Sequence, residues 1–111
     1  MEKFNIQDAL ATATPGRGLQ LLTSLNDTQI KVGKFHGRFA WHRHEREDEL
    51  FWVWRGRLTI QFRDREVCLA PGEMLVVPAG VEHRSIAAEE ADVIVIHPAS
   101  TIIPNGNPPP A

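Results

Sequence analysis

The chain has 111 residues, which is enough for one domain built around a single hydrophobic core. Apolar residues make up 42% of the chain and charged residues 23%, a balance typical of folded globular proteins and not of disordered ones. The net charge is -2 and no basic cluster is present, which argues against partners such as nucleic acid or an anionic membrane surface.

The first predicted element is a short helix over residues 3–11, where apolar side chains recur at helical spacing before Pro15-Gly16 ends the pattern. The opening MEKFNIQDAL mixes charged and apolar residues and lacks the apolar core of a signal peptide. No apolar run is long enough to span a bilayer. The single cysteine, Cys68, excludes an internal disulfide. We therefore expect a cytoplasmic protein.

From residue 19 to about residue 97 the apolar residues alternate with polar ones, as in β-strands. The expected strands cover residues 19–25, 30–35, 38–44, 49–54, 58–62, 67–69, 74–77, 81–86 and 91–96. Short strands at such regular spacing, with turn residues between them, predict an all-β sandwich or barrel. The expected organisation is an N-terminal segment over 1–18, a barrel over 19–98 and a frayed tail, rich in Pro, Asn and Gly, over 99–111.

Three histidines and one glutamate are candidate metal ligands. Because side chains on a strand alternate between faces, His42 and His44 project to the same side, about 7 Å apart. Glu49 begins a strand on which Phe51 and Val53 share its face, and we assign that face to the interior. His83 lies on a later strand and would close the site across the barrel. Imidazole nitrogens with one carboxylate suit a first-row divalent ion.

The spacing of these residues resembles the two short motifs of the cupin family. The first motif is matched by His42, His44, Glu49 and Gly56, and the second by Gly72, Pro78, Gly80 and His83. Two positions depart from the pattern: Gly37 is one residue too close to His42, and Ala87 stands where the family has an asparagine. The resemblance implies a double-stranded β-helix, or jelly-roll barrel, with His42, His44, Glu49 and His83 as the metal ligands.

Other polar residues near these motifs have simpler interpretations. Four acidic residues are expected to be solvated, namely Glu45, Glu47, Asp48 and Glu82, although Glu47 would be the alternative ligand if the loop register differed. Three arginines are expected on the surface, with anchorage of an anionic substrate as their alternative role, namely Arg38, Arg43 and Arg84. His36 and His97 fall outside both motifs, and no role is predicted for them.

The predicted outer face of residues 49–54 is strongly apolar. It carries Leu50, Trp52 and Trp54, and a small monomer rarely exposes such a patch. Cupins that resemble this chain commonly dimerise through such a face, so we expect a homodimer. Cys68 has the parity of an outward-facing residue and is interpreted as structural.

The expected cofactor is one divalent transition metal, and iron, manganese, nickel, zinc and copper all accept this ligand set. Three neutral imidazoles and one carboxylate leave net charge near +1 and two open positions in an octahedral field. The expected pocket is apolar and suits a small organic molecule.

Three hypotheses follow: a metal-dependent oxygenase or isomerase, a non-catalytic metal- or ligand-binding module, and a storage barrel with a vestigial site. The sequence names no general base.

Overall fold

The computed structural model describes residues 1–15 and 18–103. It contains one helix and seven strands, with the bounds α1 Ile6–Thr12, β1 Gln20–Leu25, β2 Thr28–Arg38, β3 Glu49–Arg55, β4 Leu58–Gln61, β5 Glu66–Leu69, β6 Met74–Val77 and β7 Arg84–Pro98. The predicted all-β class is confirmed. Residues 104–111 of the predicted tail, and Gly16 of the predicted helix stop, lie outside the described residues.

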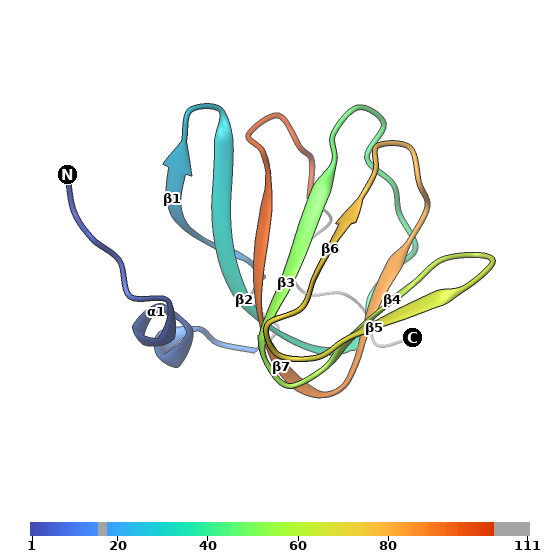
Figure 1. Ribbon diagram of the computed structural model, residues 1–111, viewed down its shortest axis with the longest axis horizontal. Helices are drawn as coiled ribbons and strands as arrows, with labels where there is room; N and C mark the ends of the chain where they lie inside the picture. The colour runs from blue at the N-terminus through green and yellow to red at the C-terminus, as the bar shows by residue number, and fades with distance from the viewer. Residues whose placement is uncertain (16–17, 104–111) are drawn as a thin grey trace.

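Helix α1 is held at both its start and its inner face. The Asn5 side chain caps it by accepting a hydrogen bond from the Asp8 amide at 2.9 Å. Leu10 is buried against Val32 of β2 and Ile94 of β7, so the helix covers part of the sheet's outer face (Figure 1). No helix in the described part of the chain is long and apolar enough to cross a membrane.

The strands form an antiparallel arrangement in the order β1-β2-β7-β3-β6, with β4 pairing to both β5 and β7 (Figure 1). Strand β7 connects the β1-β2-β7-β3-β6 sheet to the β4–β5 hairpin. Its first residues pair with β4, its last residues pair with β3, and β2 runs along most of its length. One long strand therefore brings the chain's early and late segments around a common interior.

Two predicted strand boundaries are wrong. Gly37 was expected to end one strand before another over 38–44, but β2 continues to Arg38 and residues 39–44 leave the sheet apart from a single bridge. Gly37 has φ of 89° at a shift in the β2–β7 register, so it makes a bulge that bends the strand. The expected strands at 81–86 and 91–96 belong to one strand, β7, which begins only at Arg84. The strand is continuous because β2 pairs with Ala87 and with Ala91, on either side of residues 88–90.

The predicted inward and outward faces are confirmed. On β3, Glu49, Phe51 and Val53 are buried, whereas Leu50, Trp52 and Trp54 are half-buried. Phe51 and Val53 belong to the interior cluster, as predicted. The same cluster contains Leu58, Ile60, Phe62 and Val77, and partly buried Phe39 and Leu75 pack against it. Cys68 is exposed on β5, as its parity predicted.

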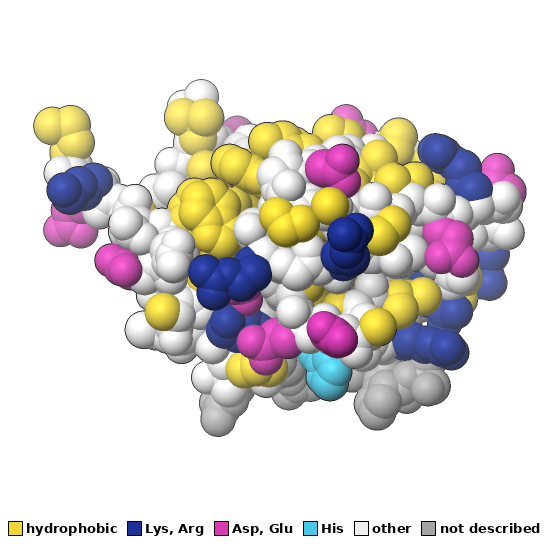
Figure 2. Space-filling model, turned by 60° about the horizontal axis from the view of Figure 1, so that its bottom comes forward, with side chains coloured by type: hydrophobic (Ala, Val, Ile, Leu, Met, Phe, Trp, Pro, Cys, Tyr) yellow, Lys and Arg dark blue, Asp and Glu magenta, His cyan; other side chains and the backbone are white. Residues whose placement is uncertain are grey.

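The surface is uneven in character. Figure 2 shows one face, on which hydrophobic side chains emerge in several places and basic side chains gather toward the β4–β5 hairpin, whose turn carries Arg63 and Arg65. On the outer side of the large sheet, Met74 and Val76 of β6 are about half exposed. They stand opposite Trp52 and Leu50 of β3, so these four side chains form a continuous apolar block, here called the β3–β6 patch.

Candidate metal centre

The backbone of the second motif holds the backbone of the first. The His42 amide donates to the His83 carbonyl at 3.0 Å, and the His83 amide donates back to the His42 carbonyl at 2.9 Å. These two reciprocal bonds place the two histidines directly opposite each other. Residues 39–44 lie outside the sheet's regular ladder, so this bridge replaces the strand that the sequence predicted there.

The other two members of the site are fixed through neighbouring turns. The Gly80 amide donates to the His44 carbonyl at 2.7 Å. Gly80 has φ of 81°, a left-handed conformation that suits glycine. The Asp48 carboxylate accepts from the Ala79 amide at 2.8 Å, which ties the charged loop to the same turn. Glu49 follows at once as the first residue of β3, opposite Val77 of β6.

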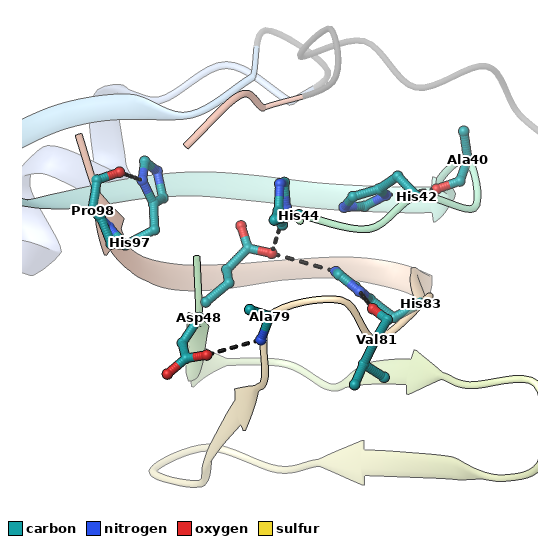
Figure 3. A network of polar contacts seen from close by, with 10 residues as sticks. Ala40, His42, His44, Asp48, Ala79, Val81, His83, His97 and Pro98 are labelled. Atoms are coloured by element: carbon teal, nitrogen blue, oxygen red, sulfur yellow. Dashed lines mark hydrogen bonds and ion pairs between the residues drawn. The ribbon is translucent and has the colours of Figure 1, made fainter. Parts of the chain in front are cut away.

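The four predicted ligands come together. One donor atom from each of His42, His44, Glu49 and His83 lies within 4.8 Å of all the others. The Oε1 atom of Glu49 is 3.3 Å from Nε2 of His44 and 3.4 Å from Nε2 of His83 (Figure 3). A first-row ion bound at about 2.1 Å needs donors about 3–4 Å apart, so this spacing fits one ion. Apart from half-buried His42, these residues are buried.

The unpaired atoms of the cluster are those that a cation would bind. The Nδ1 atom of His42 lies 2.9 Å from the Ala40 carbonyl, and that of His83 lies 2.9 Å from the Val81 carbonyl. A carbonyl accepts, so each Nδ1 carries the proton and each Nε2 presents a lone pair to the site. Nε2 of His44, Nε2 of His83 and Oε1 of Glu49 are buried without a well-aligned hydrogen bond. Lone pairs facing a carboxylate repel unless a cation or proton lies between them.

The same electrostatics appear in the pKa values. Burial alone would raise the pKa of Glu49, but the imidazoles of His44 and His83, whose Nε2 atoms lie 3.3 and 3.4 Å from Oε1, outweigh burial when they are protonated and lower the pKa to about 2. The pKa of His44 is raised, chiefly by the same close contact with the Glu49 carboxylate and against the effect of burial. Burial lowers the pKa of His42, so that ring favours the neutral form that binds metals. The carboxylate therefore stays ionised and attracts positive charge into the cluster.

Comparison with known proteins identifies the family. The Cupin_2 family model, described as a cupin domain, matches residues 29–97, which is more than half of the chain and includes all four cluster residues. The chain belongs to the cupin family. The uncharacterized protein YdbB of Bacillus subtilis is 37% identical over 65 residues, a match that spans 58% of each of the two chains.

Two solved structures support the same fold. A cupin-2 domain containing protein from Shewanella frigidimarina superposes with a TM-score of 0.83 at 39% identity, over 86% of this chain and 93% of that one. Protein NMB1881 from Neisseria meningitidis superposes with a TM-score of 0.79 at 24% identity, over 87% of this chain and 99% of that one. The second likeness shows the barrel fold alone.

The mouth of this cupin's site is a depression of about 440 Å³. One wall is formed by residues 42–47, and the other contains Ser100 and Ile102 of the segment after β7. The Ser100 hydroxyl donates to Glu47 at 2.9 Å and joins the two walls. Glu47, the alternative carboxylate, is thus engaged at the rim, and the cluster contains Glu49 instead.

The remaining charged candidates lie on the outside. Exposed Arg43 pairs with Glu45, and Glu82 pairs with Arg63. Exposed Arg38 is the last residue of β2. Arg84 donates to Gln61, and its guanidinium lies 4.9 Å from the centre of the Trp41 ring. None of these residues belongs to the convergent group found among residues 1–15 and 18–103.

One residue near the site was given no role by the sequence motifs. His97 is 1% exposed, whereas His36, also outside the motifs, is exposed. His97 has the same parity on β7 as Val93 and Val95, both of which belong to the interior cluster. Alternation along the last strand was therefore the available signal that His97 faces inward.

Proposed function

We propose that this cupin binds one divalent transition metal through His42, His44, Glu49 and His83, and that it is a metal-dependent enzyme of the oxygenase or isomerase type acting on a small organic molecule. The observation that carries the proposal is the convergence of buried donor atoms whose lone pairs lack partners. The absence of thiolates from the set favours a reactive centre over a structural zinc site.

The chain's own residues prepare the site for this role. Carbonyls behind His42 and His83 set the tautomer and orientation of these two rings. Glu49 supplies the one negative charge, which leaves a divalent ion with net charge near +1. A bound ion would supply Lewis-acid or redox chemistry at the positions that the four residues leave open. The apolar interior beneath the site limits the substrate to a compact molecule.

The test is the metal content of protein purified from its native host without chelators, measured by inductively coupled plasma mass spectrometry. We expect about one equivalent of iron, manganese, nickel, zinc or copper in the wild type and a loss in His83→Ala. His36→Ala is the matched control, because it removes an exposed histidine outside the cluster. Metal retained by His83→Ala, or absent from the wild type, would reject the ligand assignment.

Turnover separates the enzyme from the alternative, a non-catalytic metal- or small-ligand-binding module. The metal-loaded protein is screened for oxygen consumption and isomerisation with small organic acids and diketones. An enzyme shows turnover that His83→Ala abolishes and His36→Ala leaves unchanged. Tight binding of a compound without turnover would favour the binding module.

We also propose that the protein is a homodimer assembled through the β3–β6 patch. Half-exposed Met74 and Val76 beside Trp52 make this surface costly to leave in water. Val76→Lys is expected to shift the mass measured by light scattering from two chains to one. Cys68→Lys, which places the same charge on exposed β5, is expected to leave the mass unchanged. A monomeric wild type would contradict the proposal.

A further inference from the structure

His97 faces the barrel interior at the end where the metal cluster lies. Along β7, Val93 and Val95 pack in the interior cluster, whereas Ile94 and Ile96 pack with the outer one. His97 continues the inward series and is almost completely buried. An apolar residue would suit that position better unless the imidazole has a polar partner.

The strand register places His97 beside the cluster's carboxylate. Phe51 is paired with Val95, and Leu50 is paired with Ile96. One step further along the same register would bring Glu49 opposite His97. Residues that are directly opposed in an antiparallel pair have Cβ atoms about 4.5–5.5 Å apart. His97 is nevertheless outside the group of four convergent donors, so it is a neighbour of the site and not a fifth ligand.

The imidazole of His97 presents an unused acceptor. Its Nδ1 atom lies 2.9 Å from the Pro98 carbonyl, so Nδ1 carries the proton and Nε2 has a lone pair (Figure 3). Among the described residues, Nε2 of His97 is buried and has no hydrogen-bond partner. A buried acceptor left unpaired is unfavourable and is uncommon in folded proteins. A hydrogen-bond donor on a bound molecule would remove this cost.

We propose that His97 is a ligand-binding residue, and that the site takes a small α-hydroxy carboxylate whose hydroxyl donates to Nε2 of His97. This inference rests on the proposed metal site. An ion with net charge near +1 and two open positions favours a ligand with one negative charge and two donor oxygens. A carboxylate with a neighbouring hydroxyl supplies both oxygens and keeps one proton, which is the donor that His97 lacks.

The test compares two probes on the cobalt(II)-loaded full chain. Glycolate and methoxyacetate offer the same two chelating oxygens, but only glycolate keeps a hydroxyl proton. Their dissociation constants are measured from the cobalt absorption bands for the wild type, His97→Leu and His97→Gln. Leucine removes the acceptor, whereas glutamine offers a carbonyl oxygen near the position of Nε2.

The preference for glycolate over methoxyacetate is expected to fall about fivefold in His97→Leu, the loss of one ordinary hydrogen bond. His97→Gln is expected to keep most of that preference, and both variants are expected to keep one equivalent of cobalt.

The inference is overturned if glycolate fails to bind the loaded wild type, or if the preference is equal in wild type and His97→Leu. Equal preference would mean that a protein group such as the Thr101 hydroxyl, also buried without a partner, satisfies Nε2. Loss of cobalt in His97→Leu would also overturn it, by making His97 a ligand. A wild type that takes up no metal would instead reject the metal site itself.

Discussion

The two faces of strand β3 have different surroundings: the inner face packs inside the barrel, and the outer face is partly exposed to solvent. Glu49, Phe51 and Val53 are enclosed by the barrel and surrounded by other parts of this chain. Leu50 and Trp52 face outward beside half-exposed Met74 and Val76. Residues one position apart on a strand therefore serve different purposes. The inner face combines packing with the candidate metal centre, and the outer face presents an apolar surface.

The comparison predicts that equal truncations on the two faces have unequal effects on folding. Phe51→Ala removes a ring that is 3% exposed and lies 6.1 Å from the His83 ring, and we expect it to lower the free energy of unfolding by about 3–5 kcal/mol. Trp52→Ala acts on a half-buried ring, and we expect a smaller loss of about 1–2 kcal/mol because less area leaves the protein interior.

Urea denaturation of the metal-free protein measures both losses, with the denaturant slope checked for each variant. The measurements are made at concentrations low enough to keep the chains monomeric, since dimerisation would add to the apparent effect of Trp52. Equal losses for the two variants would show that the outer face is packed as tightly within one chain as the interior is.

Glu49→Gln tests the chemistry of the inner face separately from its packing. The substitution keeps the shape of the side chain but removes the charge whose pKa is held at about 2 by His44 and His83. We expect metal affinity to fall by about 100-fold or more, because a neutral amide oxygen is a poorer ligand than a carboxylate. Competition with a chromophoric chelator measures the change, and Trp52→Phe is the control on the other face. An affinity within about threefold of wild type would remove Glu49 from the ligand set.

Acid should weaken metal binding at the inner face of β3. The apolar packing of the outer face should not change with pH. Ligating imidazoles must be neutral, so protons compete with the ion as pH falls through about 6.5. The raised pKa of His44 means that this ring takes up a proton first, at higher pH than an ordinary histidine. We expect a loss of about tenfold in affinity for each pH unit once one proton competes. Full occupancy at pH 4 with excess chelator would place the ion elsewhere.

The sequence predicted the inward and outward faces well where alternation was regular. Strand β4 alternates large apolar residues with polar ones, and its burial alternates with them. In β3, Glu49, Phe51 and Val53 share the buried face, as predicted. Alternation failed at Gly37, because a glycine within a strand pattern fits either an end or a bulge. It also failed at residues 87–90, where alanines and glutamates have weak strand preference and pairing with β2 on either side of them keeps β7 continuous.

The candidate metal centre was predicted from motif spacing, but its supporting structure was not. Spacing named His42, His44, Glu49 and His83, which the fold brings together. The carbonyls behind the rings could not be foreseen, because they depend on the backbone course of residues outside regular strands. The motifs predict no role for His97, because they do not include it. Its parity on β7 nevertheless indicates that its side chain faces the barrel interior.

The length of β7 has a consequence for how the protein is made. Every strand that pairs with β7, from β2 to β4, precedes it in the chain. Sheets built from such distant segments fold slowly, since the intervening chain must be ordered before the contacts form. During synthesis the early histidines and Glu49 leave the ribosome without His83 and without their closing strand. The nascent chain therefore cannot assemble the full donor set, and binding of the proposed metal by all four residues would have to follow the completion of the barrel.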